Sequence, residues 1–119
     1  MNDVLFWNLE LTIKPGKLDD LRALVADMSA RTKAHEPGTL SYEWSVNEDG
    51  TECHIYERYT DSGALMAHLG GFQEHFAGRF FDVLDIKRWV LYGNPSDQVR
   101  ETLAGFGAAF FKPIGGFSR

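Results

Sequence analysis

The segment from residue 39 to residue 59 constrains the fold most, because it reads as two strands joined by a tight turn. From Leu40 to Val46, apolar and polar residues alternate with the two-residue period of a strand that has two different faces. Asp49-Gly50 indicates a turn, since glycine readily adopts the positive φ of tight hairpin turns. Residues 51–59 then read as a second strand. The sequence therefore predicts a β-hairpin in the middle of the chain.

The segments on either side of this hairpin have the periodicities of further strands and helices. In chain order, we expect a strand at 4–13, a helix from 18 to 35, the hairpin, a short helix at 64–69 that Gly70-Gly71 interrupts, a second helix from Phe72, a strand at 85–92, a short helix to about residue 103 and a short last strand at 108–111. The main order, strand–helix–strand–strand–helix–strand, is that of the ferredoxin-like βαββαβ fold. The sequence therefore predicts an α+β protein with an antiparallel sheet.

The expected sheet has one face without a cover. In a ferredoxin-like unit both main helices pack on the same face of the sheet. Phe6 and part of the aromatic set on the hairpin must then lie on the other face. An exposed apolar sheet face is typical of an interface, and a second copy packed sheet to sheet would cover it. We therefore expect a homodimer whose two sheets form an α+β barrel.

Charge and composition argue against several classes of partner. The formal net charge of −5 disfavours nucleic acids and acidic membranes, which basic patches bind. No segment approaches the ~20 apolar residues of a membrane span. No basic stretch precedes the first apolar run after Met1, so a secretory signal is not expected. The single cysteine, Cys53, is expected to be a buried hydrophobe in a reducing compartment. These features predict a cytoplasmic location and no nucleic-acid or membrane partner.

Several short motifs together resemble a known family. Residues 36–43, with the sequence EPGTLSYE, are similar to the "EPG-x-L-x-Y-E" signature of the antibiotic biosynthesis monooxygenase family. Residues 56–61, then Ala64, His68-Leu69 and His75-Phe76, are similar to a second family segment. The resemblance covers Val4 to Tyr92. It implies a monooxygenase-type ferredoxin-like domain at 1–93, which forms a dimeric α+β barrel, and residues 94–119 are expected to be a C-terminal extension of the same domain.

The resemblance also implies an activity. Characterised members include cofactor-independent monooxygenases, which oxidise a quinol or polycyclic phenol with molecular oxygen and need no metal or flavin. The expected partners are thus a second copy of the chain, a small aromatic substrate and molecular oxygen. Two alternatives stay open. One is a non-catalytic dimeric barrel that binds a small aromatic ligand, and the other is a haem-degrading oxygenase that uses Asn8 with His68 or His75. Haem-degrading relatives carry Trp where this chain has His68, which weighs against haem.

Oxygenation without a cofactor needs a base, a group that stabilises an oxyanion, and an apolar pocket. His68 is the candidate base, because imidazole titrates near neutral pH; the alternative is that it only packs at a helix end. Asn8 and Arg88 are candidates for stabilising negative charge on oxygen. The expected pocket residues are Phe6, Trp44, Tyr56, Phe72, His75 and Trp89. Tyr42 is a further candidate for the pocket wall. No metal site is expected, because the histidines lack a ligand spacing such as His-Glu-x-x-His.

Overall fold

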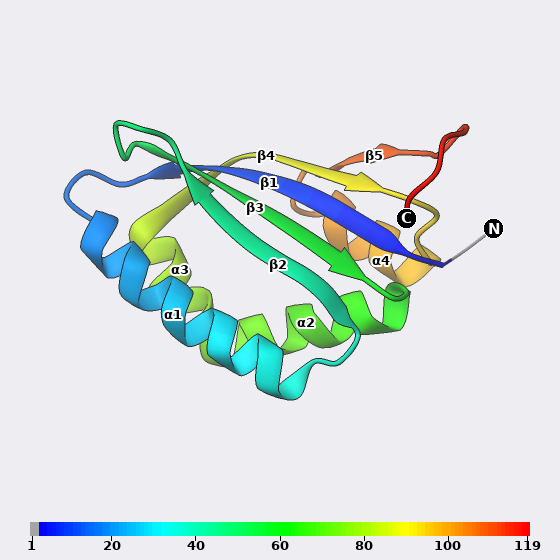
Figure 1. The fold of residues 1–119 in the computed structure, drawn as a ribbon, viewed down its shortest axis with the longest axis horizontal. Helices are drawn as coiled ribbons and strands as arrows, with labels where there is room; N and C mark the ends of the chain where they lie inside the picture. Colours follow the sequence, from blue (N-terminus) through cyan, green and yellow to red (C-terminus); the bar gives the residue numbers. More distant parts are fainter. Residues whose placement is uncertain (1–2) are drawn as a thin grey trace.

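A five-stranded sheet with helices packed against it forms the protein in the computed structural model, which describes residues 3–119 (Figure 1). The strands are β1 (Leu5–Ile13), β2 (Thr39–Val46), β3 (Glu52–Tyr59), β4 (Leu84–Tyr92) and β5 (Ala109–Phe111). The helices are α1 (Leu18–His35), α2 (Ser62–His75), α3 (Ala77–Val83) and α4 (Asp97–Ala104). The predicted α+β, ferredoxin-like fold is confirmed. Met1 and Asn2, part of the N-terminus compared with a secretory signal, lie outside the described residues.

The strand order is β2-β3-β1-β4-β5, with β1 between β3 and β4. The pairs β1–β3, β1–β4 and β2–β3 are antiparallel, whereas β5 is parallel to β4. Helices α1, α2 and α3 all lie on one side of the sheet, below it in Figure 1. This arrangement encloses a core between the sheet and the helices, and no helix of residues 3–119 lies on the other sheet face.

The core is centred on β1, because alternate residues of this strand point toward the helices. Its inward set is almost fully buried and consists of Leu5, Trp7, Leu9, Leu11 and Ile13. From α1, Leu21, Leu24 and Met28 pack against these residues. Burying each such side chain stabilises the fold by about 1.5–3 kcal/mol, before the entropy of ordering it is subtracted. The inward face of the sheet is therefore the structural core.

The hairpin loop is longer than Asp49-Gly50 alone suggests. Gly50 has a φ of 72°, but Asp49 does not have a positive φ, so the loop is not a two-residue primed turn. Instead the Asn47 side chain closes the loop, because its Oδ1 accepts hydrogen bonds from the backbone N–H groups of Thr51 and Glu52, both at 2.9 Å. The loop between β2 and β3 is thus held by a side chain as well as by glycine.

The expected interruption at Gly70-Gly71 is wrong, because α2 runs without a break from Ser62 to His75. Glycine in a helix costs roughly 1 kcal/mol relative to alanine, which tertiary contacts can outweigh. The Asp61 side chain caps the start of α2 by accepting from Ala64 N at 2.8 Å, and Leu65 is fully buried. The chain leaves helical geometry at Phe76 instead, where φ is −130°, and α3 follows.

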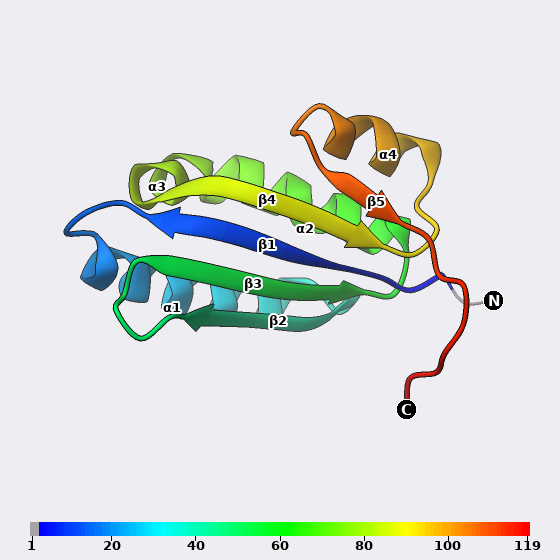
Figure 2. The ribbon, with the colours of Figure 1, turned by 90° about the horizontal axis from the view of Figure 1, so that it is seen from above.

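The residues after Gly93 extend the sheet and add a helix. Ser96 caps α4 by accepting from Val99 N at 3.3 Å, and Val99 and Leu103 are fully buried. The short last strand, β5, pairs with β4, so the sheet has one strand more than the four of the predicted unit. Figure 2 shows that the chain leaves β5 at the end of the sheet where the N-terminus also lies.

Cys53 points into the core from β3 and is fully buried. Burial raises the pKa of its thiol to about 11, so the group stays protonated at neutral pH. Among the helices of residues 3–119, none is long and apolar enough to cross a lipid bilayer.

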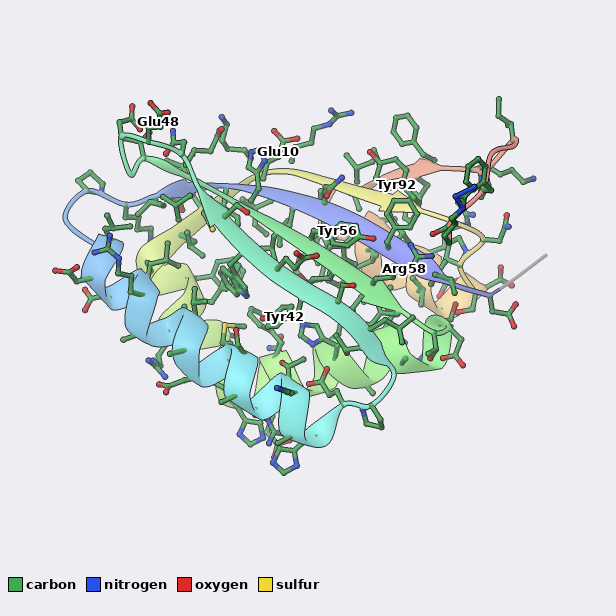
Figure 3. All side chains as sticks on the ribbon, in the orientation of Figure 1. Glu10, Tyr42, Glu48, Tyr56, Arg58 and Tyr92 are labelled. Atoms are coloured by element: carbon green, nitrogen blue, oxygen red, sulfur yellow. The ribbon has the colours of Figure 1, made fainter. Side chains whose placement is uncertain are left out.

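An aromatic cluster covers part of the sheet face that lacks helices. Phe6 and Tyr92 stack with ring centroids 4.8 Å apart, and Tyr56 lies 6.0 Å from Phe6. The Arg58 guanidinium lies 5.4 Å from the centre of the Phe6 ring, a cation–π distance. Figure 3 shows Tyr56, Arg58 and Tyr92 on this side of the sheet, away from the helices. We call Phe6, Tyr56 and Tyr92 the outer-face cluster.

Candidate functional site

A buried histidine lies between two carboxylates on the helix side of the sheet. The Nδ1 atom of His68 is 2.7 Å from Glu36 Oε1, and its Nε2 atom is 3.0 Å from Glu57 Oε1. The side chains are 6 % exposed for His68, 11 % for Glu36 and 3 % for Glu57. Both imidazole nitrogens therefore face an acceptor, the arrangement in which a doubly protonated ring donates two hydrogen bonds.

Three separate elements bring these side chains together. Glu36 is the residue at which α1 ends, and its N–H still donates to Thr32 O. Glu57 occupies an inward position of β3, in the alternating buried set that also contains Cys53 and Ile55. His68 lies on the buried side of α2. The site thus depends on how α1, α2 and β3 pack, and not on a local sequence motif alone.

The close packing of Gly38 against α2 sets the position of Glu36. A Cβ atom on Gly38 would lie only 2.6 Å from the Cβ of Ala64, so any other residue would collide there. Gly38 O also accepts a hydrogen bond from Thr60 N at 2.9 Å. Since Ala64 is one helical turn before His68, this contact holds the end of α1 next to the histidine.

The charges of the two carboxylates keep His68 protonated. Burial alone would lower the pKa of His68, but the charges of Glu57 and Glu36 and the hydrogen bonds to both outweigh it and raise the pKa to about 10. Burial alone would raise the pKa of Glu36, yet the hydrogen bond and charge of His68 hold it below its usual range. At neutral pH the site is therefore an imidazolium between carboxylates.

Two tyrosines complete the polar cluster. The Tyr59 hydroxyl donates a hydrogen bond to Glu57 Oε1. The Tyr42 ring lies 5.2 Å from the His68 ring, and its hydroxyl donates only to the thioether of Met28, at 3.9 Å, which is a weak acceptor. Figure 3 shows Tyr42 pointing from β2 toward the helices. Burial and the negative charge of Glu57 raise the pKa of both tyrosines, so both hydroxyls stay protonated and can donate.

The polar cluster forms one wall of an apolar cavity of about 320 Å³ between the sheet and the helices. Its lining is mainly aliphatic and aromatic, with Glu57 and His68 as the charged side chains among the described residues: Trp7, Leu9, Met28, Tyr42, Ile55, Glu57, Met66, His68, Leu69, Gly70, Phe72, Gln73, Phe80, Phe81, Ile86, Trp89, Thr102 and Phe106. Ligand sites have this character, with a few polar groups in an apolar pocket.

Four of the residues expected from the sequence line this cavity, namely Tyr42, His68, Phe72 and Trp89. Trp44 lies beside it, 5.7 Å from the ring of Tyr42. His75 is on α2 but outside the cavity, with its Nε2 3.5 Å from Glu74 Oε2. Because α2 is continuous, His68 and His75 belong to the same helix, yet only His68 is buried in the cavity wall, and His75 is exposed at the end of the helix.

The structure does not bring Asn8, Arg88, Phe6 or Tyr56 to the cavity. Asn8 is exposed on β1 between the inward residues Trp7 and Leu9, so it points to the other face of the sheet. Arg88 pairs with Glu10, in the outward-facing set of β1. Phe6 and Tyr56 belong to the outer-face cluster. These four residues and His68 therefore lie on opposite faces of the sheet.

Glu36, Glu57 and Tyr59 are site residues that the sequence reasoning missed. A signal for Glu57 and Tyr59 exists in the alternation of β3, since both share the face of Cys53 and Ile55. A carboxylate among buried apolar residues is a candidate functional group, because a buried charge needs a partner. Glu36 is the first residue of the EPG-x-L-x-Y-E signature, but no local pattern indicates its contact with His68, which spans 32 residues of sequence.

The site does not fit a haem iron. An iron ligand must offer a nitrogen lone pair, whereas both nitrogens of His68 are directed at carboxylate oxygens. The other two residues expected to act on haem are not at this site, because Asn8 lies on the opposite face of the sheet and His75 lies outside the cavity. Within residues 3–119, no group of three or more His, Cys, Asp or Glu side chains is arranged to hold a metal ion.

Comparison with known proteins identifies similar sequences and folds. The sequence model of the family described as "Antibiotic biosynthesis monooxygenase" matches residues 6–79. The structure of MupZ from Pseudomonas fluorescens is 30% identical in sequence with a TM-score of 0.87, and the match covers 100% of this chain and 91% of MupZ. Among curated proteins, none matches this sequence.

Two further structures share the fold over most of their length. Rv0793 from Mycobacterium tuberculosis is 25% identical with a TM-score of 0.65, over 79% of this chain and 96% of that chain. SnoaB from Streptomyces nogalater, described as a cofactor-independent oxygenase, is 18% identical with a TM-score of 0.65, over 79% of this chain and 95% of SnoaB. At that identity the likeness to SnoaB concerns the fold.

Proposed function

Because the chain belongs to the antibiotic biosynthesis monooxygenase family, we propose that it is a cofactor-independent monooxygenase that oxidises a quinol or polycyclic phenol with molecular oxygen. The family description and the cofactor-independent activity of SnoaB support this proposal. In such a reaction the substrate supplies all the electrons. A quinol and O₂ give a hydroxyquinone and water, so one oxygen atom enters the product and the other leaves as water.

The observation that carries the proposal is the ion pair of His68 and Glu57 in the wall of an apolar cavity. A protonated imidazole has no free lone pair, so His68 is not the base at neutral pH. We assign the base role to the Glu57 carboxylate, which accepts the proton of the substrate hydroxyl. The His68 imidazolium and the Tyr42 hydroxyl then stabilise the resulting oxyanion and donate when the second oxygen atom leaves as water.

A second candidate function is favoured by the same charges. Two carboxylates surround one imidazolium, so the cluster carries a net negative charge that disfavours a free substrate anion. Glu57 and His68 together instead form a base and an acid side by side. Such a pair suits redox-neutral proton transfer, in which a substrate proton passes to Glu57 while His68 protonates a substrate oxygen.

Oxygen consumption by the metal-stripped protein tests the proposal, with reduced naphthoquinols, anthrones and catechols as substrates. We expect uptake above the autoxidation blank, and a loss of about 10² or more in kcat for Glu57→Gln, the usual contribution of a general base. His75→Ala is the matched control, because His75 lies outside the cavity, and it should keep full activity.

The outcomes separate the candidates. Uptake that persists in Glu57→Gln would remove Glu57 from the mechanism. Conversion of these substrates under argon, lost in Glu57→Gln, would replace the oxygenase by the proton-transfer reaction. Binding without any conversion would identify a non-catalytic barrel that holds a small aromatic ligand.

We also propose that the protein acts as a homodimer that buries the outer-face cluster of both copies. Phe6, Tyr56 and Tyr92 form a continuous aromatic surface on a sheet face that no helix of residues 3–119 covers. Sheet-to-sheet packing of two copies would bury these rings without changing the cavity on the helix side.

A further inference from the structure

The outer wall of the cavity is built by residues that follow the family-matched segment. The match ends at residue 79, whereas Trp89, Thr102 and Phe106 also line the cavity. Thr102 belongs to α4, and Phe106 follows directly after this helix. Glu57 and His68 thus come from the family segment, whereas Thr102 and Phe106 come from the C-terminal extension.

Phe106 is held in place although its side chain is exposed. Its N–H donates to Leu103 O at 3.0 Å, and Ala108 N donates to the same oxygen at 3.2 Å. Leu103 is itself fully buried, so this short loop is anchored in the core. The Phe106 ring lies 5.7 Å from the ring of Trp89, yet it is 54 % exposed. A ligand in the cavity would cover this apolar surface, which is favourable.

Phe81 of α3 is a second cavity-lining residue that is exposed at the surface. Its exposed fraction is 41 %. Its ring packs against Phe72 and Phe80 at centroid distances of 6.2 and 5.1 Å. Phe81 and Phe106 therefore each have one part in the cavity lining and another part at the surface of the molecule.

The charges in the cavity restrict what can bind. Among the described lining residues there is no Lys or Arg, and His68 is already paired with two carboxylates. A second anion beside Glu57 would be repelled and would lose its hydration without a cationic partner. The cavity therefore suits a neutral molecule with an oxygen-bearing end near Glu57 and an apolar remainder.

From these observations we propose that Phe106 determines substrate specificity, by packing against the apolar part of a neutral substrate whose oxygen-bearing end lies at Glu57 and His68. This inference rests on the proposed function for its assignment of the cavity as the substrate site. It adds the chemical class of the substrate and a role for the C-terminal extension. Longer or polycyclic substrates gain the contact with Phe106, and short phenols do not.

Quenching of tryptophan fluorescence measures this directly, because Trp7 and Trp89 line the cavity. The probes are 4-ethylphenol, 4-hexylphenol and the anion 4-hexylbenzoate. For the unchanged protein we expect 4-hexylphenol to bind at least about tenfold more tightly than either of the others, from buried methylene groups and from charge. In Phe106→Ala the preference for hexyl over ethyl should fall to about threefold or less.

Phe117→Ala is the matched control, because Phe117 is an exposed tail residue that does not line the cavity. It should keep the full chain-length preference. Phe106→Leu keeps an apolar side chain and should give an intermediate preference, so the test does not depend on one variant. An equal preference in the unchanged protein and Phe106→Ala would overturn the role of Phe106. Tight binding of 4-hexylbenzoate would overturn the neutral class.

The binding readout is independent of turnover. A loss of chain-length preference in Phe106→Ala supports the inference even if no quinol is oxidised. The absence of quinol oxidation would contradict only the proposed oxygenase activity. If the protein oxidises a quinol but Phe106→Ala leaves the chain-length preference unchanged, the proposed oxygenase is supported and the role of Phe106 is overturned.

Discussion

At the scale of single residues, two carboxylates, Glu36 and Glu57, pair with one histidine, His68. Taking charges out of water is costly, and removing one partner of a buried pair typically costs about 3–5 kcal/mol, because the remaining charge is left uncompensated. From the sequence alone, His68→Ala is the simplest substitution to test His68 as a base. In the structure it would leave Glu36 and Glu57 buried without their cation. Glu57→Gln keeps a hydrogen-bond acceptor for His68 and is the sharper substitution.

The pH dependence of stability follows from the same pairing. The folded pKa of His68, about 10, lies above its ordinary value of 6.5, so the stabilisation is fully present below pH 6.5 and is lost as pH rises to about 10. For Glu36 the folded pKa is lowered from 4.5, so its contribution is lost as pH falls through the lowered value. We expect urea unfolding to show a decrease of about 1.4 kcal/mol per pH unit between pH 6.5 and 9.5.

His54→Ala is the control for this profile, because His54 is half exposed and its Nε2 lies 3.4 Å from Glu52 Oε2. Its unfolding should have the same slope, whereas His68→Gln should lack the slope. If the free energy of unfolding of the unchanged protein did not change with pH in this range, His68 would be neutral in the folded state. Its imidazole would then be the candidate base in place of Glu57.

The site shows what a sequence reveals at this scale. The position of His68 in a family-like motif, and the aromatic character of Tyr42, Phe72 and Trp89, were enough to predict four lining residues. The prediction of Asn8 as a site residue did not place it at the cavity, because the alternation along β1 puts Asn8 on the face opposite to Trp7 and Leu9. Glu36 depends on contacts between α1 and α2 that no local pattern encodes.

At the scale of elements, the Gly38–Ala64 contact joins the turn between α1 and β2 to α2, and it can be tested. Gly38→Ala would push against the Cβ of Ala64 at 2.6 Å. We expect it to destabilise the fold by about 1–3 kcal/mol, the usual cost of overpacking, and to lower turnover by displacing Glu36 from His68. The double variant Gly38→Ala/Ala64→Gly removes the collision and should recover most of both losses, which thermal unfolding and oxygen uptake would measure.

Gly16→Ala is the comparison, because a Cβ there would meet nothing within 4 Å, although its φ of 76° adds backbone strain. It should lower stability without lowering turnover. If Gly38→Ala were as stable and active as the unchanged protein, the packing account of the motif would be wrong.

The order and period of the elements could be predicted because each strand and helix carries its own hydrophobic pattern. The continuity of α2 through Gly70-Gly71 could not be predicted, since it was decided by the Asp61 cap and the burial of Leu65 rather than by glycine propensity. The parallel pairing of β5 with β4 is a tertiary result, because three residues carry too little pattern to specify a partner.

At the scale of the whole molecule, the helix-free sheet face sets the expected assembly. Phe6→Lys places a second positive charge beside Arg58 in the outer-face cluster. We expect the unchanged protein to sediment as a dimer at micromolar concentration and Phe6→Lys to sediment as a folded monomer, because like charges and lost ring contacts oppose the interface. Glu48→Lys, on the exposed hairpin loop, is the control and should remain dimeric. A monomeric unchanged protein would contradict the proposal.

Cys53 gives the molecule a built-in reporter. It is the one cysteine of the chain, it has no exposed surface, and its burial raises its pKa to about 11. A thiol reagent therefore reaches it only when β3 separates from its neighbours or the whole domain unfolds. Glu57 lies two inward positions further along the same strand. The rate of thiol modification therefore measures how often the structure opens in a way that would also expose the buried ion pair to water.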